Sequence, residues 1–163
     1  MSDVLRLAPS VERAIGSVHG HHIPPFYIDS INVVFTGADE TLEAVRVAST
    51  LGRAMGVPLT LVHFWEVPYP LSIESPAGVS PVETYEFMRR VRAEGIDAHV
   101  RVCLCRSEHR AMPTAFRRSS LIVVGGRRSW WPTGPERLRR RLEAAGHFVV
   151  FVDACEHREA SCA

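Results

Sequence analysis

Residues 31–64 read INVVFTGADETLEAVRVASTLGRAMGVPLTLVHF, and the fold class can be inferred from this segment. The β-branched run Ile31–Phe35 ends at Thr36-Gly37, a pattern typical of a buried strand that closes in a tight turn. The 3.6-residue spacing that follows predicts a helix from its N-cap Asp39 to Met55, and Leu59–Phe64 is then a second apolar strand. The side chains expected on the buried face of this helix are Ala44, Val47, Ala48, Leu51, Ala54 and Met55.

The same alternation of strands and helices continues to the end of the chain. A capping box at Ser80-Pro81-Val82-Glu83 predicts a helix that ends at Gly95 and turns Val82, Tyr85, Met88 and Val91 inward. The later elements expected are an edge strand at Ile96–Leu104, a helix at Glu108–Arg117 weakened by Pro113, a strand at Leu121–Val124 closed by Gly125-Gly126, a helix opened by the capping box Thr133–Glu136, and a last strand at Phe148–Val152. Because strand–helix–strand crossovers are right-handed, this order predicts an α/β fold with a five-stranded, parallel, doubly wound sheet that carries helices on both faces.

Composition and charge limit the class of protein. The 163 residues are 46% hydrophobic and 23% charged, which excludes a disordered chain, a collagen-like repeat and a coiled coil. Every one of the 19 basic residues is arginine, and the net charge of +1 hides a segregation: −6 over residues 1–88, +10 over 89–141 and −3 over 142–163. Such an asymmetry permits an anionic partner for the second half. The sequence contains no signal-peptide pattern and no apolar run of membrane-spanning length, so we expect a cytoplasmic protein.

Two segments carry a resemblance to a known family. INVVFTGADETLEAVRVASTLGRAMGVPLTLVHFWEV and SSLIVVGGRRSWW, with the short terminal strand, resemble the universal stress protein family. The resemblance implies the strand order 3-2-1-4-5, a domain over residues 31–153, an N-terminal extension or linker over 1–30 and a tail over 154–163. The first segment is also similar to the C-terminal regulatory domain of cation/proton exchangers, which has the same fold.

The resemblance bears on nucleotide binding. Members that bind ATP usually carry an aspartate at the end of the first strand, where this chain has Thr36. They also carry Gly-x2-Gly-x9-Gly-(Ser/Thr) after the fourth strand; here Gly125 is kept, but Arg128 and Leu138 occupy the other glycine positions. The resemblance therefore implies a degenerate nucleotide-binding motif and no cofactor, with ATP as the alternative.

Ligands of open α/β sheets bind outside the carboxyl ends of the strands, where the strand order reverses. In the order 3-2-1-4-5 this switch point lies between the first and fourth strands. The candidate nucleotide- or anion-binding residues are Thr36, Gly37, Ala38, Asp39, His63, Gly125, Gly126, Arg127, Arg128 and Ser129. In the competing interpretation the glycines only turn the chain, the arginines are solvated, Trp130-Trp131 pack over the end of the sheet, and His63 is a core or rim histidine. The insertion over residues 66–80 is a candidate lid.

Metal binding, catalysis and nucleic-acid binding are not expected. Cysteines and histidines form three groups (Cys103, Cys105 and His109; Cys155, His157 and Cys162; His19, His21 and His22), none with the spacing of a structural zinc site. No nucleophile elbow, zinc-protease motif or Walker loop is present, which indicates a protein that is not an enzyme. The basic helix with Arg137, Arg139, Arg140 and Arg141 lacks interleaved aromatic residues, so we interpret it as a solvated face.

The last strand bears on assembly, because FVVFV at an open sheet edge promotes aggregation unless it is covered. Family members often pair this strand across a two-fold axis, so the resemblance implies a homodimer with Phe148, Val150 and Val152 at the interface. Three functions follow as hypotheses. The first is a non-enzymatic regulatory or binding module. The second is an ATP- or adenine-nucleotide-binding stress protein that uses the loops 36–39 and 125–129. The third is a cytoplasmic accessory domain of a membrane transporter, docked through residues 1–30.

Overall fold

The computed structural model describes residues 28–74, 82–127, 129–130 and 133–154 of the chain. In order, the elements are β1 (Ser30–Val34), α2 (Ala38–Met55), β2 (Leu59–Glu66), α3 (Val82–Ala93), β3 (His99–Cys105), α4 (Glu108–Ala111), the 3-10 helix η1 (Met112–Thr114), β4 (Ser120–Gly126), α5 (Gly134–Ala144) and β5 (Phe148–Asp153). The predicted start of the second helix, Ser80-Pro81, and nearly all of the predicted extension and tail lie outside the described residues.

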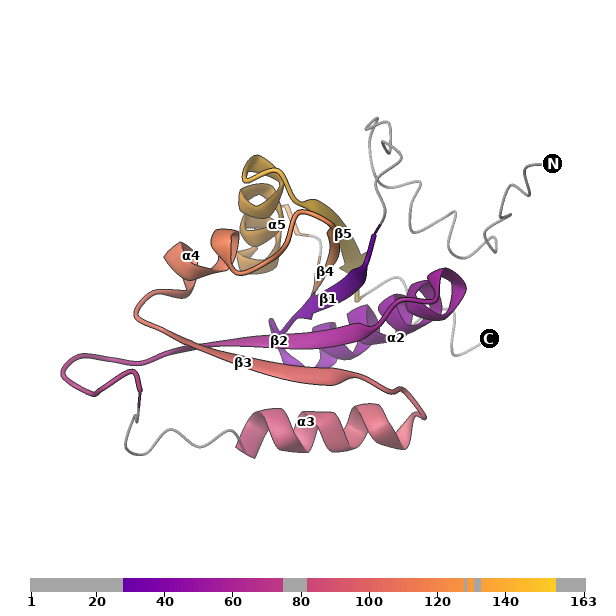
Figure 1. The fold of residues 1–163 in the computed structure, drawn as a ribbon, viewed down its shortest axis with the longest axis horizontal. Helices are drawn as coiled ribbons and strands as arrows, with labels where there is room; N and C mark the ends of the chain where they lie inside the picture. The colour runs from indigo at the N-terminus through magenta and orange to yellow at the C-terminus, as the bar shows by residue number, and fades with distance from the viewer. Residues whose placement is uncertain (1–27, 75–81, 128, 131–132, 155–163) are drawn as a thin grey trace.

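The strands form one parallel sheet in the order β3-β2-β1-β4-β5, which confirms the predicted fold class and strand order (Figure 1). β1 lies in the centre, with Val34 beside Val62 of β2 on one side and beside Val124 of β4 on the other. The order reverses between β1 and β4, so the carboxyl ends of these two strands define the switch point. Among the described helices, none is long and apolar enough to cross a membrane.

The helices cover both faces of the sheet, and each face has its own apolar core (Figure 1). Ile31 and Val33 of β1 face α2 and α3, and Val34 faces α4, η1 and α5. Successive side chains of a strand point to opposite faces, so a central parallel strand is a nearly continuous apolar run, interrupted here by the buried Asn32. This is the physical reason that INVV predicts a buried strand.

The buried face of α2 differs from the predicted one. Gly37, rather than Asp39, is the N-cap, and Asp39 lies in the first turn. A Cβ at Gly52 would lie 3.2 Å from the carbonyl oxygen of Val57, because the helix crosses the returning chain at that point. Beyond Gly52 the helix buries no further residue, so Ala54 and Met55, predicted on the buried face, are exposed. The residues that α2 buries are Thr41, Leu42, Ala44, Val45, Ala48, Leu51 and Gly52.

Three further predictions are corrected and two are confirmed. α3 buries Thr84, Phe87, Met88 and Val91, whereas Val82 and Tyr85, predicted inward, are exposed. β3 is an edge strand as predicted, but its apolar side chains Val100, Val102 and Leu104 are exposed because no described helix packs closely on them. The helix predicted at Glu108–Arg117 is a single turn followed by η1, since Pro113 interrupts the helical hydrogen bonds. Thr133 caps α5 by accepting a hydrogen bond from the Glu136 amide, as the capping box predicts.

Candidate functional site

The switch point brings together the β1–α2 loop and the end of β4. The Thr36 hydroxyl donates a hydrogen bond to the Gly125 carbonyl oxygen at 2.8 Å, so the two predicted loops meet directly. By the resemblance described above, Thr36 stands where ATP-binding universal stress proteins usually carry an aspartate. Here its side chain fastens β1 to β4.

The glycine pair at the end of β4 has a packing role. A Cβ at Gly125 would overlap the Glu40 carbonyl oxygen and lie 2.6 Å from the carbonyl carbon, because the first turn of α2 lies directly against the strand. A Cβ at Gly126 would lie 2.6 Å from Pro135 and 2.8 Å from the Phe151 ring. Both positions therefore require glycine so that α2 and α5 can pack on the sheet, which favours the structural interpretation of Gly125-Gly126 over the phosphate-binding one.

The backbone amides of the β1–α2 loop already have acceptors inside the chain. Thr41 is completely buried, and its hydroxyl oxygen accepts from the amides of Thr36 at 3.0 Å and Gly37 at 3.3 Å. Amides at a helix N-terminus are the groups that usually bind a phosphate. At this switch point the two amides that precede the first turn, those of Thr36 and Gly37, bind a side chain one turn into α2.

A carboxylate lies over the N-terminus of α2. A Cβ at Gly37 would lie 2.8 Å from Glu40 Oε2, which shows that the Glu40 side chain folds back above the loop. Arg127 Nε lies 3.2 Å from Glu40 Oε1. Asp39, the predicted ligand next to it, pairs instead with Arg90 on α3, at 3.3 Å. The predicted anion site thus contains an anion that belongs to the chain itself.

Sequence reasoning missed Glu40 and Thr41, although the spacing carried a signal. Glu40 is three residues after the N-cap Gly37, the position from which a glutamate reaches back in a capping box. Of the remaining candidates, Arg128 lies outside the described residues, as does Trp131. Trp130 is 93% exposed, so the expectation that it packs over the end of the sheet is wrong.

His63 lies one strand away from the switch point and belongs to a row of aromatic rings. Its Nδ1 is 2.6 Å from the Thr84 hydroxyl of α3, and its ring centroid is 4.5 Å from Phe35 and 5.6 Å from Trp65. Burial lowers the pKa of His63 below its ordinary value, against a smaller opposing effect of the Glu83 carboxylate. This surrounding matches the interpretation of His63 as a rim histidine that joins β2 to α3.

The described part of the predicted lid is held at the carboxyl end of β3. The Arg106 guanidinium donates to the carbonyl oxygens of Val67 at 3.0 Å, Pro68 at 3.1 Å and Leu71 at 2.6 Å. It also lies 4.1 Å from the centre of the Tyr69 ring, in cation–π geometry. This segment is therefore fastened in place, and residues 75–80 of the predicted insertion lie outside the described residues.

The thiols of β3 form no recognisable reactive or metal site. Burial and the carboxylates of Glu66 and Glu108 raise the pKa of the Cys105 thiol, which disfavours the nucleophilic thiolate. Within residues 28–74, 82–127, 129–130 and 133–154, no group of three or more potential ligands could hold a metal ion. The predicted groups around Cys155 and His19 lie outside those ranges.

The predicted basic helix, α5, pairs two of its arginines with acidic residues one turn away. Arg139 lies 3.2 Å from Glu143 and Arg140 lies 3.2 Å from Glu136. These intrahelical pairs are typical of a solvated helix face.

The predicted dimer residues of β5 serve the core of the monomer. Val150 and Val152 are buried beneath α2, and Phe148 packs against the same core. A homodimer through β5 stays a prediction, and the backbone rather than these side chains would have to form it.

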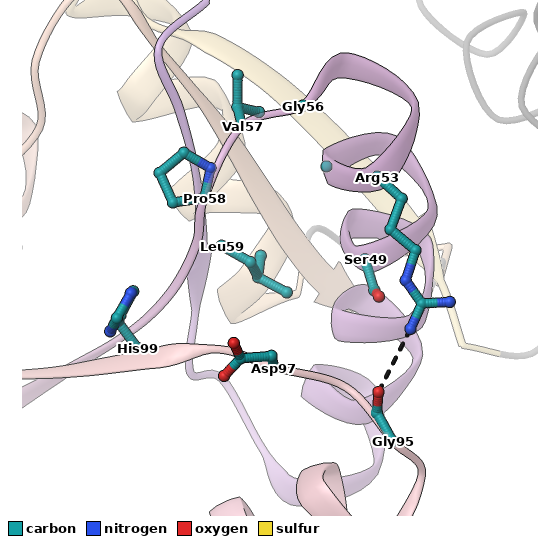
Figure 2. A pocket seen from close by; sticks show the side chains of 10 residues that line it. Ser49, Arg53, Gly56, Val57, Pro58, Leu59, Gly95, Asp97 and His99 are labelled. Carbon is teal, nitrogen blue, oxygen red and sulfur yellow. Dashed lines mark hydrogen bonds between the residues drawn. The ribbon is translucent and has the colours of Figure 1, made fainter.

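A separate hollow lies at the opposite end of the sheet, beside the amino ends of β2 and β3 (Figure 2). It has a volume of about 370 Å³. Arg53 reaches across it and donates to the Gly95 carbonyl oxygen at 3.3 Å, while Asp97 and His99 come from the segment that enters β3 (Figure 2). None of the predicted site residues lines this hollow.

Comparisons with known proteins agree with the fold. No family model matches the chain, and no curated protein matches it. A universal stress protein from Archaeoglobus fulgidus has a TM-score of 0.55 and 18% identity, with 77% of this chain and 93% of that chain covered. The universal stress protein from Archaeoglobus fulgidus in complex with dAMP has a TM-score of 0.54 and 18% identity, with 78% of this chain and 99% of that chain covered. A universal stress protein in complex with cAMP has a TM-score of 0.50 and 18% identity, with 79% of this chain and 98% of that chain covered. These likenesses establish a universal stress protein-like fold, and the similarity to exchanger domains stays a prediction.

Proposed function

We propose that this chain is a non-enzymatic binding or regulatory module of universal stress protein-like fold whose switch point does not take a nucleotide. One observation carries the proposal: Glu40 lies over the N-terminus of α2 and pairs with Arg127. The two groups that would attract a phosphate, the helix N-terminus and the arginine, both have the chain's own carboxylate beside them.

Electrostatics explains why this arrangement opposes nucleotide binding. A helix N-terminus carries about half a positive charge, and a carboxylate in the first turn is already stabilised by it. A phosphate placed there would lie beside Glu40, and like charges at short range repel. The phosphate would also have to draw the amides of Thr36 and Gly37 away from Thr41.

Thermal unfolding with and without nucleotide tests the proposal. A ligand at a hundred times its dissociation constant stabilises a protein by about 2.7 kcal/mol, so binding at millimolar ATP, dAMP or cAMP is readily detected. We expect no shift for the wild-type chain. We expect a shift for Glu40→Ala, which frees Arg127 and the N-terminus of α2, and none for the control Glu43→Ala, which removes a carboxylate one turn further along. A wild-type shift that disappears in Arg127→Ala would contradict the proposal.

The second candidate is a nucleotide-binding stress protein. Two observations favour it: two of the structural neighbours are complexes with dAMP and cAMP, and the Arg127 side chain is more than half exposed at the switch point. In this case Arg127→Ala weakens nucleotide binding, and unchanged binding would exclude this placement of the ligand. The transporter-accessory hypothesis stays a prediction, tested by whether co-purification with membranes depends on residues 1–30.

A further inference from the structure

The hollow beside the amino ends of β2 and β3 is formed by two turns of the same kind. α2 ends at Gly56, with a φ of 67°, and Gly95 follows α3, with a φ of 71°. Glycine adopts this left-handed conformation at little cost, and each turn leads into one of two neighbouring strands. A Cβ at either glycine would meet nothing within 4 Å. The space between the two turns is therefore left open.

Polar side chains from separate parts of the chain surround this hollow. Ser49 and Arg53 belong to α2, Asp97 lies just before β3, and His99 is the first residue of β3. Figure 2 shows the two α2 residues on one side of the hollow and Asp97 and His99 on the other, with Leu59 of β2 between them. Three elements thus contribute to the hollow, rather than a single loop.

The charged groups around the hollow have few partners inside the chain. A guanidinium is a fork of several N–H donors, and that of Arg53 makes one hydrogen bond to a described residue, at 3.3 Å to the Gly95 carbonyl oxygen. The side chains of Asp97 and Ser49 make none to the described residues. Arg53 and Asp97 do not pair with each other, because they lie on opposite sides of the hollow (Figure 2). Both charges are available to a ligand.

These charges favour a ligand that carries both signs. Arg53 lies in the last turn of α2, and the carboxyl end of a helix carries about half a negative charge. A simple anion at Arg53 would lie near this helix end and across from the Asp97 carboxylate, and a simple cation at Asp97 would lie across from Arg53. A zwitterion places each of its charges beside the opposite one.

The wall between the two charges is apolar. Leu59 is 6% exposed, and Val57 packs against the same core cluster, so the core holds both side chains in place. The volume of about 370 Å³ lies at the lower end of the range of small-molecule sites, roughly 300–1,000 Å³. Such a site suits a molecule of amino-acid size whose hydrocarbon part can lie on Leu59.

We propose that this hollow binds a small α-amino acid with an apolar side chain. The ligand carboxylate accepts hydrogen bonds from Arg53 and Ser49, its ammonium group donates to Asp97, and its hydrocarbon lies against Leu59. This inference goes beyond the proposed function, because it assigns the module a class of ligand. It does not depend on whether the switch point takes a nucleotide, since the hollow lies at the opposite end of the sheet.

Titration of the full chain with L-leucine, followed by the NMR signals of the backbone amides, tests the proposal. We expect saturable shifts for residues 49–59 and 95–99, with a dissociation constant of about 1 mM, the order expected for a ligand of few atoms in an open site. The matched probes are 4-methylpentanoate, which lacks the ammonium group, and 3-methylbutylamine, which lacks the carboxylate. Each should bind about tenfold more weakly or worse, because each leaves one charge of the hollow unpaired.

Charge-neutral variants locate the ligand. Arg53→Gln and Asp97→Asn should each weaken leucine binding by about tenfold or more. The controls Arg89→Gln and Glu86→Gln remove exposed charges of α3 that do not line the hollow, and they should bind leucine as the wild type does. Far-UV circular dichroism establishes that all four variants are folded. The proposal would be overturned by a wild type without saturable shifts at tens of millimolar leucine, by equal affinity for either analogue, by unchanged binding in both hollow variants, or by shifts confined to the switch point.

Discussion

Substitution of Gly125 by alanine tests whether this glycine serves packing or ligand binding. The added Cβ would overlap the carbonyl oxygen of Glu40 and lie 2.6 Å from its carbonyl carbon, about 0.8 Å short of ordinary contact. The obstacle is the backbone of the first turn of α2, which is fixed by the hydrogen bonds of Thr41. The strand or the helix must therefore move as a unit to accept the methyl group.

The magnitude follows from the kind of contact that is violated. Overpacking of a core costs about 1–3 kcal/mol, and a clash with backbone belongs at the upper end of that range. Replacing glycine also restricts the unfolded chain, which returns about 0.4–1 kcal/mol where the native conformation suits alanine. We expect Gly125→Ala to lower the free energy of unfolding by about 2–3 kcal/mol, which in a chain of this length lowers the melting temperature by about 4–12 °C.

Urea unfolding followed by circular dichroism measures this difference, and Gly37→Ala is the matched control. A Cβ at Gly37 meets only the end of the flexible Glu40 side chain, at 2.8 Å, and the φ of 172° is extended backbone that any residue adopts. We expect the control to lower stability by only about 1 kcal/mol, because alanine is less favoured than glycine at an N-cap but meets no backbone here. A Gly125→Ala chain as stable as the control would refute the packing explanation and reopen the phosphate-binding one.

Three further predictions concern groups outside the switch point. Burial lowers the pKa of His63 from its ordinary value of 6.5, so the unfolded chain binds this proton more readily than the folded one. The free energy of unfolding therefore declines as pH falls below 6.5. His63→Gln should remove this decline, measured by urea unfolding at a series of pH values. The hydrogen bonds from Arg46 lower the pKa of Glu94 from 4.5, so their contribution to the free energy of unfolding is present above pH 4.5 and is lost as pH falls through the folded pKa. A Glu94→Gln chain whose stability depends on acidic pH as the wild type's does would count against this prediction. Arg106→Ala removes the donor that holds the β2–α3 loop. We expect faster hydrogen exchange of the Leu71 amide, which donates to the Pro68 carbonyl oxygen. Unchanged exchange would show that other contacts hold the loop.

The fold could be predicted from the sequence because its signals are periodic and local. A largely apolar run such as INVV predicts a central strand that is buried on both faces. The capping box at Thr133 marks the start of α5 through a contact between residues only three positions apart. The faces of the helices were harder to predict. Tyr85 has the spacing of a core residue on α3, but at this end of the sheet none of the described elements covers it. Helical spacing cannot reveal where the sheet ends.

The site could be predicted only in its position. Strand order alone brings Thr36 to Gly125, and the structure places these two residues in direct contact. The contents of the site depend on side-chain contacts that no motif describes: the Thr41 hydroxyl that accepts from two amides, and the Glu40 carboxylate that reaches Arg127. A glycine that matches a phosphate-binding pattern can thus be required by helix packing instead.

The internal carboxylate has an advantage over any free anion at the switch point. Glu40 is attached three residues after the N-cap, so its effective concentration at the N-terminus of α2 exceeds that of a dissolved phosphate. It also pairs with Arg127 without the loss of translational freedom that a free ligand would undergo. Removal of Glu40 would leave Thr41 still bound to the amides of Thr36 and Gly37, so a fully open anion site requires the loss of both groups. If the proposed function is right, the switch point resists nucleotides through two independent contacts, and a single substitution opens it only in part.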